Sequence, residues 1–154
     1  MKTRPIYMDN QSTTRPDARV VDAMLPFLTE EYGNAASVTH IYGLDAQAAV
    51  EAARQKVADL LGCEPKTIVF TSGATESNNI ALKGVLRGAK PGSHLIINAA
   101  EHKAVIDPAR KLEREGFEVT ILPVDKWGMV DPASVKNHIK PTTALVSVML
   151  ANNE

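Results

Sequence analysis

The spacing of apolar and polar residues predicts a chain in which short strands alternate with helices. Residues 94–98 and 117–122 form short apolar runs, and residues 143–150 form a nearly continuous one. Such runs are typical of strands that are buried on both faces. Residues 67–71 form another run, rich in β-branched side chains, and a short strand is expected at residues 6–8.

The first helix is expected just after a polar loop near the N-terminus. Pro16 and Asp17 suit its first turn, with Thr14 or Arg15 near the cap. Pro26 falls inside the helical pattern and should kink or shorten the helix. Its apolar face comprises Val20, Val21, Met24, Leu25 and Leu28.

A long helix is expected at residues 44–61, with Gly62 placed to end it at the C-cap. Its apolar stripe comprises Leu44, Ala48, Ala52, Val57, Leu60 and Leu61. Further helices are predicted at residues 74–86 and 104–114, and a short one opens at residues 131–132. From residue 67 onward the order βαβαβαβ predicts an α/β fold, with a mostly parallel sheet, flanking helices and right-handed crossovers.

Composition narrows the class of protein. The chain has 154 residues, of which 44% are hydrophobic and 23% charged, as in an ordinary soluble domain. The net charge of −1 gives no electrostatic reason to expect nucleic acid or a membrane surface as partner. Apolar runs of six residues or fewer are too short for a transmembrane helix. The single cysteine, Cys63, excludes an internal disulfide and fits the cytoplasm.

An apolar strand at residues 143–150 has no following helix to cover it, so we expect a longer protein.

A polar cluster at residues 71–79 follows one predicted strand and opens a helix. The amides around Ala74 and Thr75 would be unpaired donors at the helix N-terminus, which favours an anionic phosphate. The alternative is ordinary capping of the helix by Ser72 or Thr75, and the residues of this cluster alone favour that explanation.

Two further polar clusters follow predicted strands. His102, in residues 100–103, could act as an acid or base or stack on a planar ring; the alternatives are a helix cap or simple exposure. Asn152 and Asn153 could donate to a ligand oxygen or form an ordinary turn. No second ligand-type residue stands at metal-binding spacing from His102, so no metal site is expected. Ligands bind beyond the carboxyl ends of strands in open α/β sheets, and these clusters suit a phosphorylated planar cofactor.

Together these residues resemble the N-terminal part of a cysteine desulfurase, in the class V aminotransferase group of pyridoxal-phosphate enzymes. The matching stretches are collinear and span the chain. They are IYMDNQSTT (6–14), YGNAAS (32–37), FTSGATESNN (70–79), EHKAV (101–105) and NNE (152–154). The resemblance implies the large domain of a fold-type I enzyme. Residues 1–15 would be an N-terminal segment, and residues 16–154 an incomplete cofactor-binding α/β domain.

The resemblance also implies roles for single residues. Ala74 and Thr75 would bind the phosphate of pyridoxal 5′-phosphate. His102 would stack on its ring and take part in proton transfer, and Asn153 would hydrogen-bond its phenolic oxygen. The family converts L-cysteine to L-alanine and carries the sulfur as an enzyme-bound persulfide, for iron–sulfur cluster assembly or thiolation. A cytoplasmic homodimer and a sulfur-acceptor or scaffold protein as partner are implied as well.

Some residues that the family needs have no counterpart here. They are the Schiff-base lysine, the aspartate facing the pyridine nitrogen and the persulfide cysteine. Lys103 and Cys63 do not match those positions, so the chain is expected to be inactive by itself. Two alternatives remain open. One is a segment of selenocysteine lyase or another class V enzyme. The other is a non-catalytic binding module that partners a desulfurase or a scaffold protein.

Overall fold

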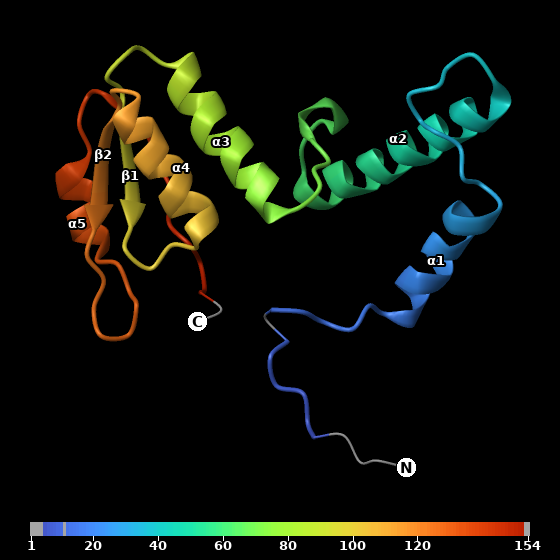
Figure 1. The fold of residues 1–154 in the computed structure, drawn as a ribbon, viewed down its shortest axis with the longest axis horizontal. Coiled ribbons are helices and arrows are strands. Elements are labelled where there is room, and N and C mark those ends of the chain that lie inside the picture. The colour runs from blue at the N-terminus through green and yellow to red at the C-terminus, as the bar shows by residue number, and fades with distance from the viewer. Residues whose placement is uncertain (1–4, 11, 153–154) are drawn as a thin grey trace. The chain divides into compact units, whose positions relative to one another are not determined.

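The computed structural model describes residues 5–10 and 12–152, and the chain divides into two compact units, Met1–Phe70 and Thr71–Glu154. The first unit is helical, whereas the second is an α/β layer (Figure 1). In chain order the elements are α1 (Ala18–Thr29), α2 (Ile41–Leu61), the 3-10 turn η1 (Pro65–Thr67), α3 (Ala74–Gly88), β1 (His94–Asn98), α4 (Lys103–Arg114), β2 (Glu118–Leu122), α5 (Pro132–His138) and β3 (Thr143–Val146). The predicted α/β class is confirmed.

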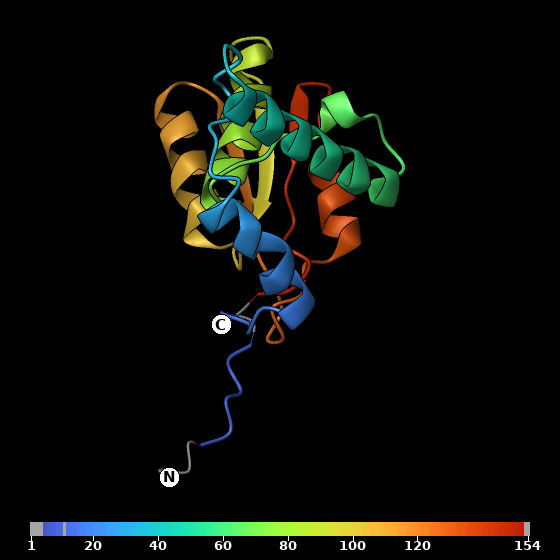
Figure 2. The ribbon, with the colours of Figure 1, turned by 90° about the vertical axis from the view of Figure 1, so that its right-hand side faces the viewer.

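The second unit is built on a parallel sheet with the strand order β2-β1-β3. The central strand β1 is buried along its whole length, because α4 and α5 lie on opposite sides of the sheet (Figure 2). The core joins α3 and α4 to β1. It comprises Leu82, Leu86, Leu95, Ile97, Val105, Ala109 and Leu112. This packing brings the N-terminal ends of α3 and α4 to the same edge of the unit as the carboxyl ends of β1 and β2 (Figure 1).

The prediction for the last strand is wrong in length. The apolar run at 143–150 predicts a strand buried on both faces, but β3 ends at Val146, and within the described residues it pairs with β1 alone. Its residues are alternately half-buried and exposed. The ladder stops because the Ser147 amide makes a last bond to the carbonyl of Ile96 (2.9 Å), whereas the Met149 amide donates to the Glu101 carboxylate (2.6 Å). The hydrophobicity of a segment does not reveal that a side-chain carboxylate will accept a hydrogen bond in place of a backbone carbonyl of the neighbouring strand.

Helix α1 begins later than predicted. Asp17 is its N-cap, and the Asp17 carboxylate accepts a hydrogen bond from the Arg19 amide (2.8 Å), so Thr14 and Arg15 lie outside the helix. Pro26 does not shorten α1, which continues to Thr29. The predicted apolar face is present but remains exposed in the structure, since no residue of α1 is buried.

Helix α2 has the predicted end but not the predicted buried face. Gly62 is its C-cap with φ 67°, as expected. The buried residues of α2 are Gly43, Ala46 and Ala58 instead of the predicted stripe. The reason lies in the preceding loop: a Cβ on Gly43 would come within 1.7 Å of the Ser37 carbonyl oxygen. The loop therefore covers the small residues at the start of α2, while the larger apolar side chains stay outside.

Two predicted strands, at residues 6–8 and 67–71, do not form. Near the N-terminus the Tyr7 hydroxyl donates to the Asp9 carbonyl (2.8 Å), which closes a local turn. In the second segment Pro65 begins the 3-10 turn η1, and Arg54 donates to the Ile68 carbonyl (2.6 Å). The β-branched side chains favour extended backbone, but local hydrogen bonds take the place of a neighbouring strand.

His94, the first residue of β1, is fully buried and bridges all the strands of the sheet. Its ring nitrogens lie 2.8 Å from the hydroxyls of Thr143 on β3 and Thr120 on β2. The Thr143 hydroxyl also accepts from the Lys140 amide (2.8 Å). Each threonine hydroxyl can donate to a ring nitrogen or accept from it, so in either tautomer one nitrogen of His94 donates and the other accepts. The neutral imidazole therefore has both hydrogen bonds satisfied.

Acid should destabilise the second unit through His94. Burial lowers the pKa of this imidazole; Glu118 raises it by a smaller amount, and Lys140 and His138 lower it slightly. Because the unfolded chain binds the proton more readily, stability is full above about pH 6.5 and falls as the pH drops from there towards the folded pKa. We expect the free energy of urea unfolding to fall by up to about 1.4 kcal/mol per pH unit in this window. His94→Gln should flatten the slope and His138→Gln should not; equal slopes in all three proteins would contradict this role of His94.

Candidate active site

The first turn of α3 presents unpaired backbone donors. Gly73 is the N-cap and makes no side-chain capping bond. The Glu76 carboxylate instead turns back to Ser72, accepting from its amide (2.6 Å) and its hydroxyl (2.8 Å). Both bonds lower the pKa of the Glu76 carboxyl, and the bond from the Ser72 amide has the larger effect. Among the described residues no side chain caps the amides of Ala74 and Thr75, so neither Ser72 nor Thr75 caps the helix as the alternative explanation required. This end of α3 can accept an anion.

His102 is the N-cap of α4. Its Nδ1 accepts a hydrogen bond from the Ala104 amide (3.0 Å), which is the capping role considered for this residue. In the neutral ring this bond leaves the proton on Nε2, so the outer nitrogen is a donor. The side chain is exposed. The cap thus fixes one nitrogen of the imidazole and leaves the other free to meet a ligand.

Thr75 and His102 line one groove, which runs between α3 and α4. The groove has a volume of about 530 Å³, within the usual range for small-molecule sites. Its other lining residues include the cationic Lys83, Lys103, Lys111 and Arg114 and the single acidic residue Asp107. The structure therefore brings the first two predicted polar clusters together, in surroundings that favour a negatively charged ligand.

The third cluster lies beside the second. The Asn152 side-chain amide donates to the Ala100 carbonyl (2.6 Å). Asn153, predicted to hydrogen-bond a cofactor oxygen, lies outside the described residues. Its neighbour Asn152 thus reaches the turn that carries His102, which puts the end of the described chain at this edge of the sheet.

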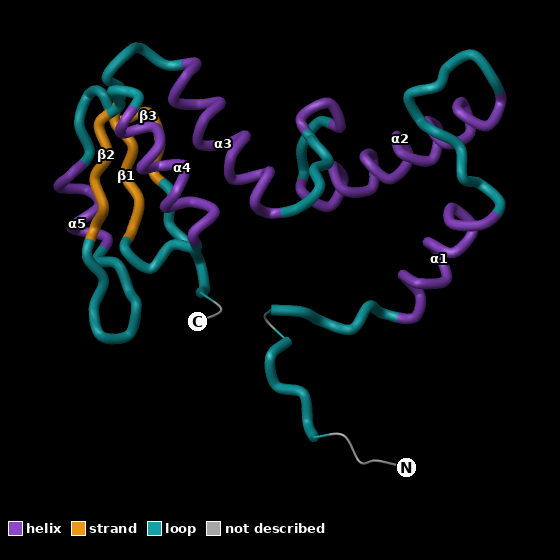
Figure 3. The backbone as a smooth tube through the Cα atoms, viewed as in Figure 1, coloured by secondary structure: helices purple, strands orange, loops and turns teal. Residues whose placement is uncertain are grey.

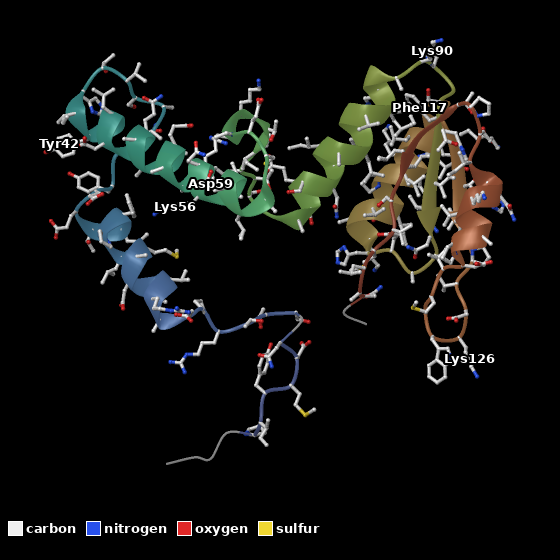
Figure 4. All side chains as sticks on the ribbon, turned by 180° about the vertical axis from the view of Figure 1, so that it is seen from behind. Tyr42, Lys56, Asp59, Lys90, Phe117 and Lys126 are labelled. Atoms are coloured by element: carbon white, nitrogen blue, oxygen red, sulfur yellow. The ribbon has the colours of Figure 1, made fainter. Side chains whose placement is uncertain are left out.

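A second pocket opens at the same edge, and its lining is mostly apolar. Trp127, Met129, Val148 and Leu150 contribute to a volume of about 470 Å³. Trp127 and Met129 come from the loop between β2 and α5, which projects beyond the end of the sheet (Figure 3). Lys126 marks the tip of this loop (Figure 4), and its ammonium lies 5.1 Å from the centre of the Trp127 ring. This pocket supplies apolar surface next to the polar groove residues, and sequence patterning did not reveal it.

Glu101 and Asn98 are polar residues of the site that the sequence did not single out. Both are buried, and the Glu101 carboxylate accepts from the Asn98 side chain (2.8 Å). Burial raises the pKa of Glu101, and the hydrogen bond from the Met149 amide opposes that rise. A glutamate within an otherwise exposed polar cluster carries no sequence signal of burial, since one of its partners, the Met149 amide, comes from a distant segment.

The described part of the chain contains neither a candidate metal site nor a candidate membrane-spanning helix. No group of three or more His, Cys, Asp or Glu side chains there could hold a metal ion. None of the helices within the described residues has the length and apolarity needed to cross a membrane.

The model of the family described as aminotransferase class-V matches residues 6–154. The chain belongs to this family. This class-V chain is 57% identical over 152 residues to the cysteine desulfurase of Homo sapiens, covering 98% of the chain and 33% of that relative. It is 56% identical over 151 residues to the cysteine desulfurase IscS of Anaeromyxobacter sp. (strain K), covering 97% and 37%. The chain thus spans about a third of the length of the curated relatives it matches.

Solved structures agree with the class-V assignment. A NifS-like protein matches with a TM-score of 0.88 and 41% identity, over 97% of this chain and 41% of that protein. The structure described as SspA in complex with cysteine matches with a TM-score of 0.86 and 37% identity, over 96% and 43%. These likenesses confirm the predicted fold and the predicted resemblance to class V aminotransferases.

Proposed function

We propose that this chain provides part of the cofactor site of a cysteine desulfurase that uses pyridoxal 5′-phosphate and acts on L-cysteine. The observation that carries the proposal is the shared groove of Thr75 and His102, with the uncapped first turn of α3 at one side. Residues 16–154 would belong to the cofactor-binding large domain, preceded by the segment 1–15. The curated relatives named cysteine desulfurase and the neighbour in complex with cysteine support this choice of substrate.

The residues present fit the phosphate of the cofactor. The amides of Ala74 and Thr75 point from the positive end of the α3 dipole, and the Thr75 hydroxyl adds a donor on the groove side. The Glu76 carboxylate is held by Ser72, so it does not occupy those amides. Lys83 and Lys103 raise the local potential further. Together these donors would hold the phosphate and orient the ring that is attached to it.

His102 would hold the ring and move protons. When bound, pyridoxal 5′-phosphate supplies an electron-accepting ring. The cap to the Ala104 amide fixes the imidazole at Nδ1, which sets the plane in which the ring can stack. Its outer nitrogen, Nε2, then donates or accepts a proton at the substrate side. We assign the hydrogen bond to the phenolic oxygen of the cofactor to Asn153.

The remaining parts of the proposal concern partners and location. A sulfur-acceptor or scaffold protein would take the sulfur for iron–sulfur cluster assembly or thiolation, and the working enzyme would be a homodimer. Cys63 is exposed and unpaired, which fits a reducing compartment, and we propose the cytoplasm. A relative from Drosophila melanogaster is named as mitochondrial, so cell fractionation is the measurement that distinguishes the two compartments.

Thr75→Val should weaken binding of the phosphorylated cofactor by about tenfold or more. The substitution keeps the shape of the side chain but removes the hydroxyl donor, and hydrogen bonds to charged groups are worth about 1.5–3 kcal/mol. Pyridoxine 5′-phosphate is the suitable probe, because it lacks the aldehyde and cannot react with surface lysines. Its dissociation constant from the 154-residue chain can be measured by NMR titration.

The matched control is Thr67→Val, on the 3-10 turn η1, because Thr67 is not among the residues that line the groove. The amides of Ala74 and Thr75 should shift on titration in the control as in the unchanged chain. If pyridoxine 5′-phosphate shifts neither amide, or if Thr75→Val binds it as tightly as the unchanged chain, the assignment of this site is wrong.

A further inference from the structure

Glu101 is a buried acidic residue beside an exposed site. Only 6% of it is exposed, although its neighbour His102 lies at the surface of the groove. Burying a carboxylate is unfavourable unless hydrogen bonds compensate. The proposed chemistry gives the Glu101 carboxylate no contact with cofactor or substrate, so its burial calls for another explanation.

The contacts of Glu101 tie two distant segments together. Its Oε1 accepts from the Asn98 side chain (2.8 Å) and from the Met149 backbone amide (2.6 Å). A second link runs in parallel, because the Asn152 side chain donates to the Ala100 carbonyl (2.6 Å). The turn at residues 98–101 and the segment at residues 149–152 are therefore joined at two points.

The Glu101 carboxylate takes the place of a backbone acceptor in the sheet. The Ser147 amide donates to the Ile96 carbonyl (2.9 Å), so the regular parallel ladder would next pair the Met149 amide with the Asn98 carbonyl. The Asn98 carbonyl instead accepts from the Glu101 amide (3.4 Å), while the Glu101 carboxylate takes the Met149 amide. This exchange ends the strand and leads the chain away from the sheet at the edge where the site lies.

We propose that Glu101 is a positioning residue that fixes the turn carrying His102 against the segment that leads to Asn153. The inference rests on the proposed function, because only a bound cofactor gives a reason to hold the turn at residues 98–101 and the segment at residues 149–152 at a fixed spacing. Glu101 acts through the backbone of its neighbours. Its role is to keep the imidazole of His102 at the distance from residues 149–152 that a planar ligand between them requires.

The test compares Glu101→Ala, Glu101→Asp and Glu101→Gln in the full chain labelled with ¹⁵N. Gln keeps an oxygen at the same reach and should preserve the link, whereas Asp is one methylene too short and Ala has no acceptor. The first readout is hydrogen exchange of the Met149 amide. We expect it to be faster by tenfold or more in Ala and Asp and close to unchanged in Gln. The Ser147 amide serves as internal reference, and Glu113→Ala, at an exposed position on α4, as the matched control variant.

The second readout separates positioning from stability. On addition of pyridoxine 5′-phosphate, the Ala and Asp variants should keep the shift of the Thr75 amide but lose most of the shift of the His102 ring, and Gln should restore it. Unchanged Met149 exchange, or an undiminished His102 shift despite fast Met149 exchange, would overturn the proposal. If Glu101→Ala does not fold, the Asp variant decides.

If the unchanged chain binds no pyridoxine 5′-phosphate, the proposed function fails. Glu101 is then judged by Met149 exchange and by contacts between the His102 ring and residues 149–152 without ligand.

Discussion

His102→Asn is expected to slow cysteine turnover by about 10²–10⁴-fold per bound cofactor and to leave the N-cap of α4 intact. The protein to test is a desulfurase of the relatives' full length that contains this chain. The range is that of a lost general acid–base group. Asn is as good an N-cap as any residue, so its side chain can accept the hydrogen bond that the Ala104 amide now gives to Nδ1. It has no titratable nitrogen to replace Nε2. The substitution therefore removes the chemistry of the imidazole and keeps its structural role.

The measurement is single-turnover desulfuration of cysteine, with cofactor occupancy determined in the same samples. His102→Ala is the second variant, and it should lose the cap as well, at a cost of about 0.5–2 kcal/mol in stability. The structure already shows that His102 caps a helix, so capping by itself cannot decide between the two roles. A near-normal rate per bound cofactor in His102→Asn would show that capping is the whole role of this residue.

Leu86→Ala is expected to destabilise the second unit by about 2–5 kcal/mol. Leu86 is fully buried on α3 and belongs to the cluster that packs α3 and α4 on β1. Removing a buried leucine loses its transfer free energy and leaves a cavity that the surroundings fill only partly. The loss should appear in urea unfolding followed by circular dichroism. Since the same packing holds the groove residues of α3 against those of α4, binding of pyridoxine 5′-phosphate should weaken along with stability.

Leu150→Ala is the matched control, since it removes the same atoms from a fully exposed position. Substitutions at such positions usually change stability by less than about 0.5 kcal/mol. Equal losses in the two variants would mean that the cluster around Leu86 is not the core of this unit.

Local signals in the sequence were sufficient for most elements of the second unit. Strand β1 has the predicted limits, 94–98, because a short, dense apolar run flanked by polar residues is compatible with few structures other than a buried strand. Helix α5 begins where Asp131 and the following proline predict, since an Asp side chain accepting an amide and a fixed proline φ define a helix start locally. The first turn of α3 and the position of His102 after β1 were likewise foreseen from polar residues that follow strands.

The first unit shows where such signals fail. The β-branched run at 67–71 favours extended backbone, yet it forms no strand in the structure, because a strand needs a partner and the Ile68 carbonyl bonds to Arg54. On α2 the small residues Gly43, Ala46 and Ala58 are buried in place of the large apolar ones. At Gly43 a close approach of the preceding loop decides the burial, and hydrophobic periodicity contains no information about it.

The sequence by itself thus determined the fold class, the order of most elements in the second unit and the residue types at the rim of the sheet, because these depend on short-range patterns. Only the tertiary structure decided that Thr75 and His102 share a groove, that β3 ends at Val146, and that Glu101 is buried. Each of these depends on contacts between segments far apart in the chain. The Glu101 carboxylate meets the Met149 amide across 48 positions. Such a bond follows from the packing of whole elements and leaves no mark on the residues around either partner.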